Sequence, residues 1–456
     1  MSPEGVERTR RLVVAFDGRS TSPMDLADTL RPLADLVWVV DSTDPTLGSM
    51  ARLLPRLGTV VDRHGRSVSE TVDDLAAAVG VVDGVVAFTD AQLSFAAELA
   101  AALSLPGNPP ATVELLNDKR AQRAALLAAG LPTPGFVRVP GGVDAADVVE
   151  LVRSLSYPLV LKPVQGESSS NVICVGDEHE LLEAFGAPPL ADRPVDHAIL
   201  AEEYLTDPPD PERTIAPYVS VESLVIDGRS VPLAISGRFP LAEPFRETGD
   251  FMPHPLETEE AETVVAVAIA AAEALGVRSG ALHTEIKLTA DGPKVIEVNG
   301  RVAGGGINAV YAERNGVSIR HLAASVALGL PIDPPPFVAE RSDGPFTYQH
   351  FVQPPVSATG LVSIGPTAEL IGRDGIGSVT VNRSPGDALD WRAGSQEYVL
   401  RVGGTAVDRA ALAAVPATIS GLIEITYASS PPGHDGVRSA RSEEHTSELQ
   451  SLTTIS

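Results

Sequence analysis

The chain has 456 residues, of which 44% are hydrophobic, and this length and apolar content predict two to four packed domains. Its net charge of −26 argues against a nucleic-acid or anionic-membrane surface, because either would need a basic stripe. The N-terminal apolar run is too short for a signal peptide or membrane span, and the single cysteine, Cys174, excludes an internal disulfide, so we expect a cytoplasmic protein.

Short apolar runs alternate with helical patterns from residue 10 to about residue 110. Strands that alternate with helices predict a parallel sheet covered on both faces, so residues 1–110 are expected to form a Rossmann-like α/β domain. No G-x-G-x-x-G follows the first run, and we therefore assign this domain no dinucleotide. The segment PGNPP at 106–110 breaks the pattern and marks a domain boundary.

The segment after this boundary carries two lysines and a polar loop. A helix capped near Asn117 or Asp118 contains Lys119, and the strand YPLVLKP ends near Lys162. Residues 166–171 then offer many backbone N–H and hydroxyl donors with little bulk, which suits a loop that covers phosphates. Most loops rich in glycine and serine are only loops, so both interpretations stay open.

Further elements follow from the same patterns. The run AILAEEYL predicts a strand, and YVSVESLVIDGRSVPLAISGRF predicts a strand pair that turns at Asp227 and Gly228. Residues 258–275 predict a helix. The glycines at 304–306 lead into another helix whose first N–H groups could hold an anion, although a plain glycine-rich connector is equally compatible.

The stretch HTEIKLTADGPKVIEVNGR at 283–301 predicts a hairpin whose two strands each have one polar face. A two-residue loop at its turn would place Glu285 and Glu297 on opposite sides of the sheet. A three-residue loop at 290–292 would instead set Glu285 opposite Glu297 and His283 opposite Asn299. We choose the second register, in which Gly292 closes the loop.

Two directly opposed carboxylates repel each other, so the hairpin needs a compensating cation. Carboxylate and carboxamide oxygens suit Mg²⁺ or Mn²⁺, which commonly bind protein carboxylates together with substrate phosphates. A solvated polar face balanced by Lys287 and Arg301 is the simpler alternative. The chain has only four lysines, at 119, 162, 287 and 294, and a lysine that persists among so many arginines can mark a required point charge.

The pattern changes again in the last quarter of the chain. Residues 336–435 show short strands with turns and predict a small β-rich domain. The final segment, RSEEHTSELQSLTTIS at 441–456, has no apolar period and resembles the translation of a sequencing adapter. We expect this segment to be a non-native tail.

The order of these parts resembles the ATP-grasp superfamily, specifically its carboxylate–amine ligases, over roughly residues 80–430. The quoted motifs NDKRAQRAALLAAGLPTP, YPLVLKP, AEEYL, YVSVES, HTEIKL and VIEVNGR carry the resemblance. It implies an ATP-grasp domain at 111–335 of two subdomains, with a lid at about 155–205. It also implies nucleotide contacts by Lys119, Lys162, Gly166, Ser168, Ser169, Ser170, Glu202, Glu203, Tyr204, Leu205 and Glu222, metal ligands at Glu285, Glu297 and Asn299, and an acylphosphate contact by Arg301.

Two features depart from the family pattern. The serine-rich loop contains Glu167, where the family has a more glycine-rich sequence, and the insert TDPPDPERTIAP at 206–217 lengthens the segment after the adenine-binding hinge. The segments FRETGDFMPHPL and EVNGRVAGGGINAV, followed by a β-rich region, are most similar to L-amino-acid ligases. Arg246 and Glu247 in the first segment are candidates for substrate selection, with a surface ion pair as the alternative.

The resemblance implies an ADP-forming carbon–nitrogen ligase that uses ATP and Mg²⁺ or Mn²⁺. Its expected partners are small-molecule carboxylates and amines, amino acids above all, and a homodimer is compatible with it. Two alternatives stay open at this point. One is a bicarbonate-activating enzyme like biotin carboxylase, and the other is a non-catalytic ATP-binding regulatory protein.

Overall fold

The computed structural model describes residues 8–19, 21–164, 166, 168–186, 190, 197–208 and 215–429. Glu167, residues 209–214 of the insert and the predicted non-native tail lie outside them. The described residues form a mixed α/β structure with a parallel sheet near the N-terminus and antiparallel sheets elsewhere, as the sequence predicted. Among these residues, no helix combines the length and the apolar character needed to cross a bilayer.

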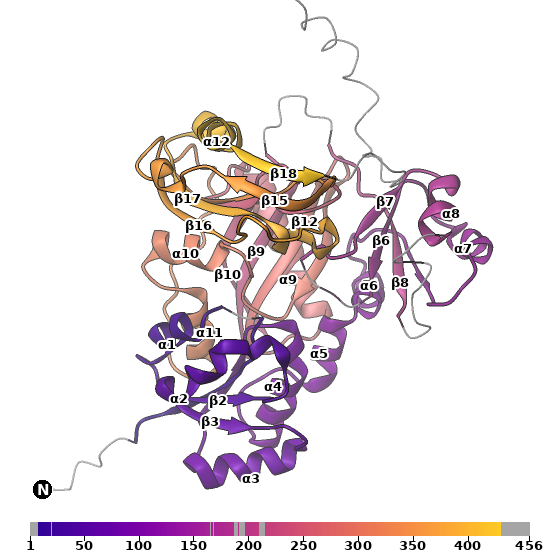
Figure 1. The fold of residues 1–456 in the computed structure, drawn as a ribbon. Coiled ribbons are helices and arrows are strands. Elements are labelled where there is room, and N and C mark those ends of the chain that lie inside the picture. The colour runs from indigo at the N-terminus through magenta and orange to yellow at the C-terminus, as the bar shows by residue number, and fades with distance from the viewer. Residues whose placement is uncertain are drawn as a thin grey trace, which may run out of the picture.

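A four-stranded parallel sheet, ordered β3-β2-β1-β4, forms the centre of the N-terminal region (Figure 1). Strands β1, β2 and β4 are largely buried because helices pack on either side, as expected for a Rossmann-like arrangement, whereas the edge strand β3 is mostly exposed. The elements are β1 (Arg11–Ala15), α1 (Pro23–Leu30), β2 (Asp35–Val40), η1 (Pro45–Arg52), α2 (Leu54–Leu57), β3 (Thr59–Asp62), α3 (Val68–Val79), β4 (Gly84–Ala87) and α4 (Asp90–Ala102).

One face of this sheet is covered by helices from much later in the chain. Leu12 and Val14 of β1 belong to the same apolar cluster as Ile319 and Leu322 of α11 (Ile319–Ala327) and Tyr311 of α10 (Ile307–Asn315). The sequence boundary near residue 110 therefore does not divide the core. Two regions that share a core in this way hold a fixed mutual orientation.

Residues 136–203 form a smaller antiparallel sheet, ordered β5-β8-β6-β7, at the right of Figure 1. It has an apolar core of its own, in which α7 and α8 pack on one face. The elements leading to and forming it are α5 (Pro110–Asn117), α6 (Lys119–Ala128), β5 (Phe136–Val139), α7 (Ala145–Val152), β6 (Leu159–Pro163), β7 (Ile173–Val175), α8 (Glu178–Gly186) and β8 (Ile199–Glu203).

The central sheet has eight strands in the order β13-β12-β9-β10-β11-β14-β17-β16. The predicted β-rich C-terminal region contributes three of them, so its strands continue the sheet that begins within residues 218–299. The proposed domain bounds at 111–335 and 336–435 remain a prediction. The strands are β9 (Tyr218–Ile226), β10 (Arg229–Arg238), β11 (Gly249–Met252), β12 (Gly280–Thr289), β13 (Gly292–Asn299), β14 (Phe346–Val352), β16 (Ile376–Val381) and β17 (Leu400–Ala406).

The remaining elements cover this sheet and its C-terminal end. Helix α9 (Thr258–Ala274) packs on one face, where Val219, Val221 and Ile286 form a single apolar cluster with it. The others are β15 (Ala358–Ile364) and β18 (Ile425–Ser429), which pair with each other, α12 (Arg409–Leu422), and the 3₁₀ turns η2 (Thr367–Leu370) and η3 (Trp391–Glu397).

The opposite face of the central sheet is polar across six neighbouring strands. Cross-strand pairing joins Glu297 to Glu285 and Glu285 to Ser220, and it joins Arg238 to Asp250 and Asp250 to Gln349. Because side chains alternate between the faces of a strand, residues paired in this way share one face. The polar residues that the sequence placed on one hairpin are therefore part of a wider polar surface.

The hairpin has the predicted register, but a two-residue turn and a β-bulge produce it instead of the predicted three-residue loop. His283 pairs with Asn299 and Glu285 pairs with Glu297. The turn, however, leaves only Ala290 and Asp291 between the strands, so the predicted three-residue loop was wrong. A β-bulge between Glu285 and Ile286 on one side and Val295 and Glu297 on the other adds the extra residue. This bulge restores the alignment that a two-residue turn alone would lose.

The other predicted turn was correct in its position. Strands β9 and β10 are joined by Asp227 and Gly228, with φ of 51° and 81°. Positive φ at both central residues is characteristic of the type I′ turn, which suits the twist of a hairpin.

Candidate active site

A large cavity of about 1130 Å³ lies between the polar face of the central sheet, the smaller sheet and the C-terminal region. The predicted site residues line it with two exceptions, Glu222 and Asn299, which lie just behind its wall. Those that line it are Lys119, Lys162, Gly166, Ser168, Ser169, Ser170, Glu202, Glu203, Tyr204, Leu205, Glu285, Glu297 and Arg301.

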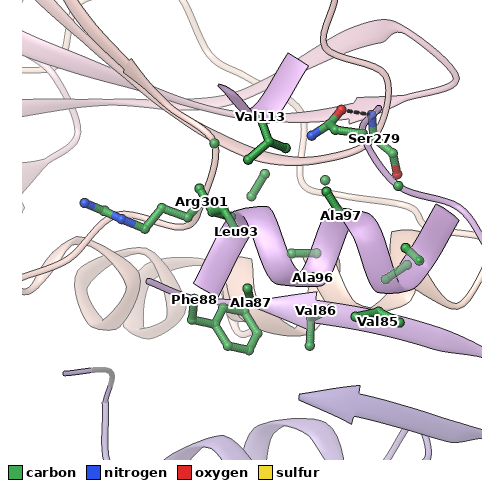
Figure 2. Close-up of a pocket in the computed structure, with 18 of the residues that line it drawn as sticks. Val85, Val86, Ala87, Phe88, Leu93, Ala96, Ala97, Val113, Ser279 and Arg301 are labelled. Atoms are coloured by element: carbon green, nitrogen blue, oxygen red, sulfur yellow. Dashed lines mark hydrogen bonds between the residues drawn. The ribbon is translucent and has the colours of Figure 1, made fainter. Parts of the chain in front are cut away.

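A second cavity, of about 90 Å³, lies behind Arg301 and is mainly apolar. Figure 2 shows that Leu93, Ala96 and Ala97 of α4 line it together with residues of β4, while the Arg301 side chain points away. Its lining offers little chemistry beyond Ser279, and we assign it to packing between the N-terminal region and the central sheet.

Lys119 links the hairpin to the serine-rich loop. Its Nζ lies 2.7 Å from Glu297 Oε1 and donates a hydrogen bond of 2.7 Å to the carbonyl oxygen of Gly166. Lys119 opens α6, where the Asp118 side chain accepts a hydrogen bond from the backbone N–H of Ala121 and fixes the start of the helix. The lysine therefore reaches the cavity from a well-defined helix terminus.

Lys162 belongs to a buried ion cluster that the sequence did not indicate. Its Nζ lies 2.6 Å from Glu202 Oε2, and Arg123 Nε lies 2.6 Å from Glu202 Oε1. Burial lowers the pKa of Lys162, and the charge of Glu202 opposes this effect. Burial also acts to raise the pKa of Glu202, but the two cations lower it overall, so the carboxylate stays ionised.

Arg123 was missed because its partners come from distant segments. It is also bonded to the carbonyl oxygen of Ile296 beside the hairpin carboxylates. One signal was present in the sequence: Arg123 follows Lys119 by four residues, which places both on one face of α6.

The predicted hinge at 202–205 has two kinds of side chain. Glu202 points into the ion cluster, whereas Glu203 accepts a hydrogen bond of 2.9 Å from the backbone N–H of Ser156. The Tyr204 ring lies 6.3 Å from that of Phe245, which connects the hinge to the loop before β11. All four residues line the cavity, and their contacts to adenine remain a prediction.

The serine-rich loop is docked on η3. The backbone N–H of Ser395 donates to the Ser168 carbonyl at 2.8 Å, and the Ser170 hydroxyl donates to the Arg392 carbonyl at 3.0 Å. Gly394 has φ of 75°, and a Cβ there would lie 2.1 Å from the Ser168 carbonyl oxygen. Glycine is therefore required at this contact for both conformational and steric reasons.

His283 sits between two carboxylates on the polar face. Its Nδ1 lies 2.8 Å from Glu222 Oε1 and its Nε2 lies 3.3 Å from Glu285 Oε1. Burial disfavours the charged imidazolium, but Glu222 and then Glu285 raise the pKa of His283 to about 10. Burial acts to raise the pKa of Glu285, while hydrogen bonding from His283, its charge and other neighbours lower it to about 2.

Glu222 is fully buried and also accepts a hydrogen bond of 2.7 Å from the Ser220 hydroxyl. Its closest connection to the cavity is through His283. The direct role of Glu222 at the nucleotide therefore remains a prediction.

The predicted metal ligands form a plausible set of hard oxygen donors. Glu285 and Glu297 are paired across the hairpin, and Asn299 lies two residues along the same face. The Asn299 amide donates to the His283 carbonyl at 3.4 Å. The described residues include no group of three or more His, Cys, Asp or Glu side chains arranged to hold a metal ion. Two carboxylates and one carboxamide at the edge of the large cavity nevertheless fit Mg²⁺, which completes its shell with phosphates and water.

Arg301 is oriented by the N-terminal region. Its Nε and Nη2 lie 2.9 and 2.6 Å from Asp90 Oδ2 at the start of α4. The sequence could not pair these residues, because they are 211 positions apart. Asp90 fixes the guanidinium of Arg301, which still lines the large cavity.

The two candidates for substrate selection have different positions. Glu247 lines the cavity, and its carboxylate accepts a hydrogen bond of 3.0 Å from Arg238 Nε. Its backbone N–H donates to the Ser395 hydroxyl in η3. Arg246 is buried and donates from Nε to the Glu243 carbonyl at 2.6 Å, away from the cavity lining. The cation near Glu247 is Arg238, which the sequence analysis did not single out.

Comparison with known families agrees with this geometry. The family model described as an ATP-grasp domain matches residues 155–309, which include Lys162, the serine-rich loop and the whole hairpin. Residues 155–309 thus resemble ATP-grasp domains in sequence. The match also covers the hinge and β9, whereas Lys119 and its helix α6 lie before it.

One solved structure resembles the chain in fold along nearly its full length. An L-amino acid ligase from Bacillus licheniformis aligns with a TM-score of 0.71 and 24% identity, covering 92% of this chain and 99% of that one. This likeness shows that the N-terminal, ATP-grasp and C-terminal regions share one fold with that structure.

Curated relatives match over a shorter span. Dapdiamide A synthase from Enterobacter agglomerans is 27% identical over 251 residues, which is 51% of this chain and 53% of the relative. Alanine–anticapsin ligase from Bacillus subtilis strain 168 is 29% identical over 258 residues, which is 53% of each. The chain matches about half the length of these two relatives.

Proposed function

We propose that this chain is an ATP-dependent ligase that joins a carboxylate to an amine through an acylphosphate, with amino acids as substrates. The observation that carries the proposal is the meeting of Lys119, Lys162, Glu285, Glu297 and Arg301 around one cavity. Cations for phosphates, acids for a divalent metal and a cation for an acyl group lie together there, which is the set that phosphoryl transfer to a carboxylate requires.

The reaction follows from the poor reactivity of a carboxylate toward amines. A carboxylate oxygen attacks the γ-phosphorus of ATP, the bond to the bridging oxygen breaks, and ADP leaves. The amine nitrogen then attacks the acyl carbon, the bond to the phosphate oxygen breaks, and phosphate and a proton are released. Coupling through the acylphosphate makes amide formation favourable at the expense of ATP.

The residues of this chain would position and screen the reacting groups. Lys119 and Lys162 supply positive charge beside the phosphates, and Arg301 can donate two parallel hydrogen bonds to the acylphosphate. The serine-rich loop, held on η3, would exclude water that otherwise hydrolyses the intermediate.

Glu285, Glu297 and Asn299 would hold Mg²⁺ or Mn²⁺. When bound, this ion would neutralise charge that develops on the phosphate oxygens. His283 would hold Glu285 in place from the strand that both share.

Amino acids are proposed as substrates because one relative is named as a ligase of alanine and anticapsin and a structural neighbour as an L-amino acid ligase. No feature of the site favours bicarbonate activation over this proposal. A regulatory protein is disfavoured because the paired carboxylates and both phosphate lysines are in place around the cavity.

The test is ADP release by the purified protein with ATP and Mg²⁺ against a panel of single and paired amino acids, with bicarbonate as a separate arm. Mass spectra of the products accompany each reaction. Release that depends on a pair and yields a condensed product supports the proposal. Release with bicarbonate alone, or none with any arm despite ATP binding, would contradict it.

A further inference from the structure

Asp250 is a buried carboxylic acid at the wall of the large cavity. It lies on β11, paired with Arg238 on β10 and Gln349 on β14, and its residue exposure is 3%. Its Oδ1 has no hydrogen-bond partner within the described part of the chain. A buried carboxylate with an unpartnered acceptor atom is costly, so its presence calls for an explanation.

The nearby arginine does not supply that partner. Arg238 Nε donates to Glu247 at 3.0 Å, and its Nη1 and Nη2 donate to Ser236 and Ser220 at 3.1 and 3.0 Å. Burial raises the pKa of Asp250 to about 7, with Arg238 opposing this effect and Glu247 adding to it. The cation is thus engaged by other acceptors, and the acid keeps one free oxygen.

Asp250 also has a defined position relative to Arg301. The backbone N–H of Gly306 donates a hydrogen bond to the Asp250 carboxyl group. Gly306 precedes α10, and residues 302–306 connect it directly to Arg301. A Cβ on Gly305 would lie 3.8 Å from Asp250 Oδ2. Arg301 is therefore at the start of this short loop, and Asp250 is bonded to its last residue, Gly306. Both side chains line the same cavity.

This pairing of opposite charges matches a zwitterion. A substrate carboxylate that approaches Arg301 would bring a neighbouring ammonium group toward an anion, and a primary ammonium can donate to Asp250 Oδ1. Hydrogen bonds between an ammonium and a carboxylate are among the stronger polar contacts in proteins.

We propose that Asp250 binds the ammonium group of the amino acid that is phosphorylated, and that it selects amino acids over otherwise identical carboxylic acids. The inference rests on the proposed ligase function and adds the residue that recognises the substrate class. Asp250 is a specificity residue that contacts the substrate, and the hydrogen bond from the Gly306 N–H holds it in position.

The test compares each active amino acid with its 2-hydroxy acid, for example L-alanine with L-lactate, in the ADP-release assay. The wild-type protein should prefer the amino acid in kcat/KM. Asp250→Asn keeps the shape and removes the charge, and it should reduce that preference roughly 10- to 100-fold, mainly through KM for the amino acid. Asp374→Asn, an exposed substitution outside the cavity lining, serves as the matched control.

Three outcomes would separate the two proposals. Wild-type protein that uses the 2-hydroxy acid as well as the amino acid would overturn the role of Asp250 without any variant. An Asp250→Asn protein that loses activity equally on both substrates would overturn it as well, because a merely structural defect does not distinguish them. Absence of ADP release with every carboxylate would instead contradict the ligase function.

Discussion

Two carboxylates on one sheet face have opposite electrostatic environments. Burial is the largest influence on both Glu285 and Asp250, yet the pKa of Glu285 falls to about 2 while that of Asp250 rises to about 7. The difference is the partner: His283 bonds directly to Glu285, whereas the cation nearest to Asp250 bonds to Glu247. Burial alone therefore does not determine the charge of an acid, because the hydrogen bonds of the neighbouring cation decide it.

The comparison also separates two roles within one cavity. The end at β12 and β13 has its charges balanced by the protein itself, through Lys119 and His283. The end at β11 has an acceptor, Asp250 Oδ1, that has no hydrogen-bond partner among the described residues. We expect the first end to be sensitive to removal of a carboxylate, and the second to be sensitive mainly to the nature of the substrate.

The largest effect should come from Glu297→Gln, which removes a carboxylate from the balanced end. It should lower kcat for ADP release at least about 1000-fold, because the proposed metal loses a ligand and Lys119 loses its partner. The fold should be preserved, as checked by circular dichroism and thermal unfolding. ADP release near the wild-type rate would refute the metal assignment.

Glu202→Gln should weaken the fold itself. It leaves Arg123 and Lys162 buried without their shared anion, and we expect a loss of about 3–5 kcal/mol in the free energy of unfolding. Glu203→Gln is the matched control, since the adjacent carboxylate lies outside this ion cluster. Denaturant titrations measure both, and equal losses in the two variants would argue against the cluster.

Asp250 should make stability depend on pH in a definite direction. Its pKa of about 7 in the folded state lies above the ordinary value of 3.8 for an aspartic acid, so the folded state binds more protons between these pH values. Stability from this group is therefore present at low pH and is lost as the pH rises toward 7, by up to about 4 kcal/mol. Asp250→Asn should gain stability relative to the wild type over this window, measured by denaturant unfolding at pH 4.5 and 8. If the difference in the free energy of unfolding between the two proteins is the same at pH 4.5 and pH 8, folding does not raise the pKa of Asp250.

The smallest effect tests whether the two ends are coupled. Residues 391–397 contact the serine-rich loop over one end and Glu247 beside the other. Gly394→Ala places a Cβ against Ser168, so we expect kcat to fall about 10-fold and a larger share of ATP to be hydrolysed without product.

Gly372→Ala is the control for this variant, because Gly372 also has positive φ but faces open space. Comparable losses in both variants would mean that strain alone, rather than docking of the loop, causes the effect.

Local patterns predicted much of this molecule. Alternation identified the polar face of the hairpin, and the opposed pair Glu285 and Glu297 followed from it. The predicted pairing was correct, but the predicted three-residue loop that led to it was wrong. The bulge at Ile296 that sets the pairing could not be predicted, because the sequence around this residue carries no clear sign of it. Four of the structural outcomes that matter most, at Asp90, Arg123, Asp250 and Gly394, depend on contacts between distant segments and have no local signature.

Three strands from the last quarter of the chain continue the central sheet beyond β11. A shortened protein that ended near residue 335 would expose the unpaired backbone edge of β11, which is a template for pairing with other chains. The C-terminal region is thus unsuited to replacement by the corresponding region of a related protein. The replacement would have to fold correctly and also pair with β11 in the same register, opposite Asp250. Evolution of substrate preference in such a protein is easier by single substitutions along the polar face than by recombination at this boundary.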